Sequence, residues 1–268
     1  MPFVAADGTG DGDFHGPSID EFFPDAILFA GTPFELNRVL LIRLLAVTVV
    51  VLLLWLGSRS MKLVPGRGQA AFEFVVDFVR KGIVIDTLGE KDGKRFMPLL
   101  FTIFFLLLGL NLTSTIPGLQ IPSTGLIGQA LLMAIIAYVT FIYAGVKKFG
   151  VGHFLKNSLW LPGVPTGVKP IVAVLEFLST FIVRPITLTL RLTMNMVAGH
   201  MLLVLCFSAT GFFFAILVGG QAIGLIGFGT LTLGVAFTVL EIFVAALQAY
   251  IFTILTAIYI QLALAESH

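Results

Sequence analysis

The chain has 268 residues, of which 57% are hydrophobic and 12% charged, and its formal net charge is +1. This composition excludes an ordinary soluble protein, because several apolar runs exceed the ~18 residues that a membrane-spanning helix needs. The alternating pattern of an outer-membrane barrel is absent, and a single cysteine excludes a disulfide framework. The sequence therefore predicts an all-α polytopic membrane protein with about five membrane helices.

The first 35 residues are acidic and contain no Lys or Arg. An ordinary signal peptide would begin with basic residues, so this segment is not one. Asp11, Asp13 and His15 could bind a metal ion, but a solvated acidic tail is the simpler interpretation. We expect 1–35 to be an acidic, partly disordered extracytoplasmic segment, followed by a single membrane domain at 36–268.

Three apolar spans are expected in the first half of the chain, at about 39–57, 97–116 and 125–146. The first two are separated by the stretch 59–95, which holds eight basic residues. The centre of this stretch, Gln69–Leu88, carries apolar residues at helical spacing. We expect this centre to form an amphipathic helix on the membrane surface.

The loops differ in charge on the two sides of these spans. Segments 59–95 and 147–169 are basic, whereas 1–35 and 117–124 contain no Lys or Arg. Basic loops mark the cytoplasmic side of a membrane. The expected orientation in the cell inner membrane therefore places the N-terminus outside and the C-terminus in the cytoplasm.

Two more apolar segments, at about 169–210 and 222–264, are longer than a bilayer requires. About 40 helical residues extend roughly 60 Å, whereas the hydrocarbon core is only about 30 Å thick. Because Gly219-Gly220 separates the segments, we predict a hairpin of two strongly tilted helices, a shape suited to wrapping a cylindrical partner. The alternative is that each segment breaks into a surface piece and an upright span.

Polar residues fall at matching positions of this hairpin. A reversal at Gly219-Gly220 places Arg191 level with Gln248, and His200 level with Glu241. A His and a Glu inside a membrane can pass protons near neutral pH. The structural alternative is a buried hydrogen-bonded pair that fixes the hairpin.

Arg191 is a permanent cation in the middle of an apolar segment. Its burial in lipid would cost at least about 2.5–3.5 kcal/mol, so it must face water, a partner or a counter-charge. We favour a role in an ion pathway over a structural ion pair with Glu241. Asn195 lies one turn later on the same face; Asn195 and Gln248 could also be neutral links between helices.

The remaining polar candidates each have a plain alternative. Arg184 could snorkel to the membrane surface, and Glu176 could line a water-filled cytoplasmic vestibule or be an interfacial carboxylate. Asn111, near Ser114, could line an outer vestibule, although capping the end of its helix is the simpler role.

Two runs resemble subunit a of the F-type ATP synthases: RPITLTLRLTMNMVAGH at 184–200 and EIFVAALQAYIFTILTAIY at 241–259. The stretch 111–117 is similar to the end of that family's second span. The resemblance covers about residues 36–264, and the pairing of the two runs is very specific.

The resemblance implies a non-catalytic stator subunit, without a cofactor or metal, that faces a rotating ring of c subunits. Protons would reach and leave the carboxylates of the ring through two offset half-channels, which couples proton flow to rotation. The implied partners are the c-subunit ring, subunit b and delta of the peripheral stalk, the catalytic head indirectly, and membrane lipids, but no nucleic acid.

Family roles also follow residue by residue from the resemblance. Arg191 matches the essential coupling arginine, and Gln248 the glutamine beside it. Physically the coupling charge must be Arg rather than Lys, since a group that loses its proton could shuttle a leak. The other matches are Asn195, His200 and Glu241 in the outer half-channel, and Arg184, Thr180 and Thr187 towards the cytoplasmic one.

The sequence departs from the family pattern at three places. His200 and Glu241 stand in the mitochondrial order, Glu176 is one residue out of register, and Ser114 occupies a position that is acidic in some members. The rival hypothesis is a self-contained proton-coupled transporter, which should show an internal repeat and a broken midplane helix. Neither is found, and motifs of hydrolytic or phosphate-binding enzymes are absent.

Overall fold

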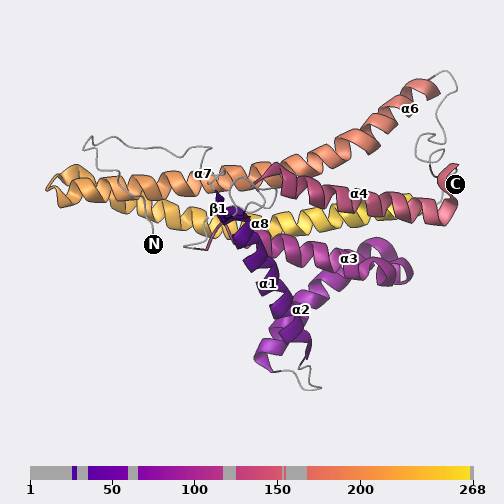
Figure 1. The fold of residues 1–268 in the computed structure, drawn as a ribbon, viewed down its shortest axis with the longest axis horizontal. Helices are drawn as coiled ribbons and strands as arrows, with labels where there is room; N and C mark the ends of the chain where they lie inside the picture. The colour runs from indigo at the N-terminus through magenta and orange to yellow at the C-terminus, as the bar shows by residue number, and fades with distance from the viewer. Residues whose placement is uncertain are drawn as a thin grey trace.

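A computed structural model describes residues 26–28, 36–59, 66–116, 125–152, 154 and 168–265. The predicted acidic segment therefore lies mostly outside the described residues, as do the expected outer loop 117–124 and most of the second basic connection. One short antiparallel pair, β1 (Ala26–Leu28) with β2 (Leu36–Asn37), precedes a helical chain. Within these described ranges, five helices are long and apolar enough to cross a membrane, which confirms the predicted all-α membrane fold (Figure 1).

The first part of the chain forms an apolar helix and a helical hairpin. α1 (Arg38–Arg59) runs across the direction of the longest helices (Figure 1). α2 (Arg67–Val79) continues through the π-helical turns of η2 (Arg80–Ile85) into α3 (Asp86–Leu112). The break between the amphipathic and the apolar parts is at Gly89, whose φ of 74° and ψ of 176° are not helical. A residue with a side chain rarely adopts this conformation.

The predicted amphipathic helix corresponds to α2, η2 and the first turn of α3. Its apolar face is buried against protein, because Val79, Ile83 and Val84 belong to the same core cluster as residues of α3 and α8. The helix therefore folds back on the membrane domain, with its charged face turned outward.

α6 (Lys169–Leu178), η3 (Ser179–Val183) and α7 (Arg184–Val218) make one continuous helix. Its apolar part covers 49 residues from Pro170 to Val218, roughly 74 Å at the usual helical rise. Pro185 does not stop it, because the wider π-helical turns of η3 precede the residue that lacks an N–H. The helix also passes the expected end near 210, where the Thr210 hydroxyl donates to the Cys206 carbonyl.

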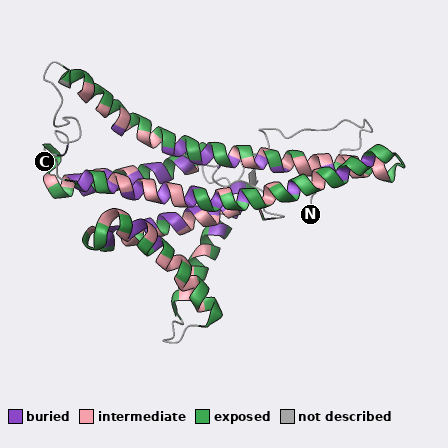
Figure 2. Cartoon of the chain, turned by 180° about the vertical axis from the view of Figure 1, so that it is seen from behind, coloured by how far each residue is buried: buried purple, intermediate pink, exposed green. Residues whose placement is uncertain are grey.

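The chain reverses at Gly219 and Gly220, and the latter has a φ of 82°. After the short turn η4 (Ala222–Leu225), α8 (Ile226–Leu264) runs back along α7. The two segments are thus unbroken helices, so the alternative of short surface pieces and upright spans is not realised. The turn end of the hairpin projects beyond α3 and α4, and its side chains are largely exposed (Figure 2).

The core lies where α3, α4 (Ile127–Phe149), α7 and α8 meet. It consists of aliphatic and aromatic side chains from all four helices, among them Leu100, Leu107, Met133, Leu188, Leu192, Phe252 and Ile260. Other apolar side chains remain exposed along α1, α4 and the hairpin (Figure 2), as in a protein surrounded by lipid or by partner helices.

Gly224 has no room for a side chain, because a Cβ there would overlap the backbone of Leu217. We expect Gly224→Ala to separate η4 from the end of α7 and to lower the free energy of unfolding by about 1–3 kcal/mol, the usual cost of overpacking. Thermal unfolding of the purified complex in detergent measures this loss. Gly229→Ala is the matched control, since a Cβ there meets nothing within 4 Å; equal losses in both variants would contradict the close approach.

Candidate functional site

The contact between α7 and α8 holds four of the predicted site residues: Asn195, His200, Glu241 and Gln248. The Thr210 and Thr230 hydroxyl oxygens lie 2.9 Å apart, and Gly199 lies directly against the Glu241 carboxylate. Both contacts agree with the antiparallel register expected from a reversal at Gly219-Gly220.

Gln248 is buried, with 1% of its surface exposed, and its Oε1 accepts a hydrogen bond from Asn195 Nδ2 at 2.9 Å. The sequence placed Arg191 level with Gln248, but the bond is made by the residue one turn later. Helical side chains lean toward the N-terminus of their own helix. In an antiparallel pair, Asn195 and Gln248 therefore lean toward each other. Gln248 Nε2 has no hydrogen-bond partner among the described residues.

Arg191 lies on the exposed face of α7. It makes no ion pair and no hydrogen bond with any residue in the described part of the chain. The structural alternative, an internal ion pair with Glu241, is therefore not what this chain forms. The cation is presented outward from the hairpin.

Glu241 is the centre of a buried polar cluster that lies nearer the Gly219-Gly220 turn than Arg191 does. Only 2% of its surface is exposed, and its Oε1 has no hydrogen-bond partner in the part of the chain that the structure describes. The Ser114 hydroxyl lies beside its carboxyl group and donates to the Asn111 carbonyl at 2.8 Å. Asn111 Nδ2 in turn donates to the Ala245 carbonyl at 3.4 Å, so its side chain links α3 to α8.

His200 is buried next to Gly199, with 6% of its surface exposed. It lies on the buried side of α7, one turn after the buried Met196. The structure thus brings His200 and Glu241 to the same level of the hairpin, while a direct proton transfer between them stays a prediction.

A second polar cluster surrounds Arg184, on the other side of Arg191. Arg184 Nη2 lies 3.7 Å from Glu176 Oε1, which also accepts a hydrogen bond from the Thr180 hydroxyl at 3.2 Å. The Arg184 guanidinium stands 5.4 Å from the centre of the Tyr259 ring. Arg184 therefore has partners within the protein and does not depend on snorkelling.

Sequence reasoning missed the two tyrosines of this cluster. Tyr259 lies against Arg184, and the nearby Tyr138 hydroxyl is buried without a hydrogen-bond partner among the described residues. They come from α8 and α4, so no local pattern could place them there. Thr187, by contrast, is exposed and donates to the Val183 carbonyl at 2.8 Å, which keeps it out of the cluster.

Arg191 stands between the two clusters along α7. It is about two turns from Arg184 and about two and a half turns from His200, roughly 10 Å and 14 Å along the axis. The fold and this site define a polytopic helical membrane protein with one buried and one half-buried polar cluster, separated by an outward-facing arginine.

The comparisons with known proteins agree with this class. The family model described as ATP synthase A chain matches residues 40–261. The chain is 47% identical to ATP synthase subunit a of Rhodococcus erythropolis over 96% of its own length and 93% of that protein. It is 40% identical to the Paenarthrobacter aurescens subunit a over the whole length of both chains. It is 37% identical to the Gluconobacter oxydans subunit a over 90% of its own length and 91% of that protein. The chain therefore belongs to the ATP synthase A chain family, whose members are non-catalytic, proton-translocating membrane subunits.

Asn195→Ala would leave the buried Gln248 amide without its hydrogen bond. We expect the free energy of unfolding of the complex to fall by about 1 kcal/mol, since an unpaired buried amide is costly but membrane hydrogen bonds are modest. The double variant Asn195→Ala/Gln248→Leu removes both partners and should recover most of this loss. Denaturation in mixed micelles tests both variants, and a double variant less stable than Asn195→Ala would refute the pairing.

Proposed function

We propose that the chain is the stator through which protons reach and leave the carboxylates of a c-subunit ring, so that proton flow drives rotation and ATP synthesis. One observation carries this proposal: Arg191 is exposed and unpaired among the described residues, between a buried polar cluster around Glu241 and a half-buried one around Arg184. A membrane protein tolerates such a cation when a partner supplies the opposite charge.

The outer half-channel in this proposal is built around Glu241. A buried carboxylate with one unbonded oxygen, a buried histidine one helix away and the hydroxyl of Ser114 can accept and pass protons. Asn111 fixes the end of α3 against α8 at this level, which keeps the Ser114 hydroxyl beside the carboxylate.

The cytoplasmic half-channel is assigned to the cluster around Arg184. Glu176 is the acceptor that a departing proton would meet, and its contacts with Thr180 and Arg184 hold it in place. The side chains of Glu176 and Arg184 are 31% and 25% exposed, which suits contact with water at the membrane boundary.

Arg191 separates the two half-channels. Its charge would attract the ring carboxylate, favour the ionised form and prevent protons from crossing directly. An arginine performs this role because its guanidinium keeps its proton, whereas a lysine can lose it in an apolar site. The Asn195–Gln248 hydrogen bond locks α7 to α8 one turn away and so fixes where the cation is presented.

The shape of the chain supports a tilted hairpin against a ring. α1 has 22 residues, about 33 Å of helix, which matches the bilayer if α1 stands upright. Because α1 runs across the direction of α7 and α8 (Figure 1), the long helices are then steeply inclined.

A peripheral stalk of subunits b and delta and, indirectly, the catalytic head would complete the complex. Membership of an ATP synthase family favours this assembly over a self-contained transporter.

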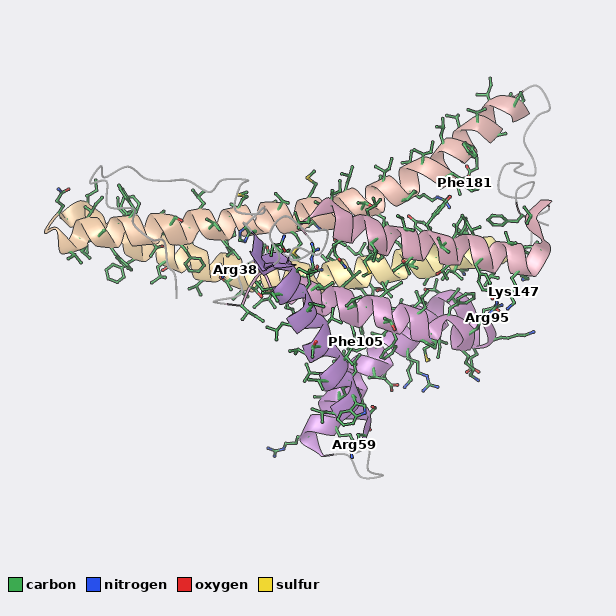
Figure 3. All side chains as sticks on the ribbon, viewed as in Figure 1. Arg38, Arg59, Arg95, Phe105, Lys147 and Phe181 are labelled. Atoms are coloured by element: carbon green, nitrogen blue, oxygen red, sulfur yellow. The ribbon has the colours of Figure 1, made fainter. Side chains whose placement is uncertain are left out.

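We infer that the N-terminus is outside and the C-terminus cytoplasmic, in the cell inner membrane. Arg95 and Lys147 lie at one end of α3 and α4, and Arg59 at the far end of α1 (Figure 3). Lys148 Nζ donates to the Leu264 carbonyl at 2.8 Å, which brings the end of α8 to the same end as Lys147. The positive-inside rule assigns these ends to the cytoplasm.

Arg191→Ala should abolish ATP-driven proton pumping in inverted membrane vesicles while the complex still assembles. The physical reason is that the ring carboxylate loses the charge that keeps it ionised. Passive proton leak should rise as well, because the barrier between the half-channels is gone. A pH-sensitive dye in the vesicle lumen measures both quantities.

Arg59→Ala is the matched control for this experiment. It removes the same charge from the end of α1, where Arg59 stacks on Trp55 at 4.8 Å from the ring centre, and should leave pumping unchanged. Normal coupled pumping by Arg191→Ala would refute the proposed function.

Gly199→Ala tests the outer half-channel without changing any charge. A Cβ at this position would overlap the Glu241 carboxylate, so the carboxylate must move. We expect pumping to fall at least about tenfold, as for other misplaced reacting groups, without a rise in passive leak. Gly211→Ala, where a Cβ meets nothing within 4 Å, is the control; equal pumping in both variants would contradict a role for the position of Glu241.

A further inference from the structure

A pair of basic side chains converges on one tyrosine at the end of α3 and α4. The Lys147 ammonium donates to the Tyr143 hydroxyl at 2.8 Å and lies 5.2 Å from the centre of its ring. Arg95 reaches the same ring from α3, with its guanidinium 5.8 Å from the ring centre. Figure 3 shows Arg95 and Lys147 side by side at this end of the molecule.

This pair has no counter-ion within the described part of the chain. Neither Arg95 nor Lys147 forms an ion pair with a described carboxylate, although both side chains are exposed. Other basic residues nearby are engaged differently, since Lys94 faces Glu90 at 3.9 Å and Lys148 bonds the last turn of α8. Two like charges held on one ring repel each other unless an anion joins them.

An exposed apolar stripe leads along α4 to this cationic pair. Leu132, Ile136, Val139 and Tyr143 follow one another at spacings of three or four residues, and Lys147 continues the series. Such residues lie on one face of a helix. Val139 and Tyr143 keep 58% and 51% of their surface exposed, so the stripe is not covered by the described residues.

We propose that Arg95, Lys147 and Tyr143 bind the phosphate of an anionic phospholipid, whose acyl chain lies along the stripe Val139–Ile136–Leu132. The phosphate accepts hydrogen bonds from the guanidinium and the ammonium, and its negative charge relieves their repulsion. The apolar stripe on the same face selects a lipid over a free anion. Basic sites between membrane helices at the cytoplasmic side recognise such headgroups.

The test uses the whole ATP synthase complex in phosphatidylcholine bilayers with a trace of phosphatidylglycerol that carries a diazirine in its acyl chain. After illumination, mass spectrometry quantifies the label on the α4 peptide that contains 132–143. Each basic residue strengthens binding to an anionic surface about fivefold, so Arg95→Gln/Lys147→Gln should reduce this labelling about 25-fold. Lys91→Gln/Lys94→Gln removes two neighbouring charges outside the pair and should leave it unchanged.

Three results would overturn the proposal. The first is equal labelling of the wild type and of Arg95→Gln/Lys147→Gln. The second is labelling of the wild type by a diazirine phosphatidylcholine to the same extent as by the phosphatidylglycerol probe. The third is displacement of the lipid by millimolar inorganic phosphate, which would indicate a free-anion site. If the double variant does not assemble, Lys147→Gln alone should reduce the labelling about fivefold. Loss of a stalk subunit together with unchanged labelling would instead assign the surface to a protein partner and refute the lipid site.

Discussion

The close antiparallel contact between α7 and α8 is the constraint on which the site depends. Glycines make this approach possible, because a Cβ at Gly199, Gly224 or Gly227 would overlap a group of the facing helix or turn. The contact leaves Glu241 and Gln248 no exposure to lipid, and it fixes which polar atoms meet across the hairpin. A carboxylate at that depth needs either a partner or a proton, and the chain gives one of its oxygens no partner among the described residues. The same packing that stabilises the hairpin therefore supplies the buried carboxylate to which the proposed function assigns proton exchange.

The contact also decides where Arg191 points. The buried sides of α7 and α8 are filled by apolar groups and by polar ones such as His200, Glu241 and Gln248, and the guanidinium lies on the exposed face. An arginine facing only lipid would be costly. A permanent internal ion pair would neutralise the guanidinium, which then could not attract the carboxylate of a partner. In the proposed function, presentation toward an exchangeable partner satisfies both conditions, because each arriving carboxylate would neutralise the cation and each protonated one could leave it.

Features that depend on chain length and local pattern could be predicted from the sequence. Helix length and Gly219-Gly220 were sufficient to predict the long hairpin, and its register followed from simple antiparallel counting.

The partner of Gln248 was missed because counting ignores the lean of helical side chains, which shifts the contact from Arg191 to Asn195. The Glu176–Arg184 contact was missed because residues eight apart are separated by about 12 Å along a regular α-helix. The π-helical turns of η3 lie between them and change this relation. Tyr138 and Tyr259 join the cluster only through tertiary packing.

The two cationic sites of this chain follow the same electrostatic rule with different consequences. Arg191 and the Arg95–Lys147 pair both lack an internal counter-ion among the described residues, so each site calls for an anion from outside the chain. Arg191 lies near the middle of the long helix Pro170–Val218, which the proposed function places within the membrane, where a low dielectric makes any pairing strong. Turnover in that function requires that the partner's charge be removable by protonation. Arg95 and Lys147 lie at the end of their helices, where solvent weakens each contact, so two cations and an apolar stripe must act together. In the two proposals, depth in the membrane thus separates a site that exchanges its partner from one that retains it.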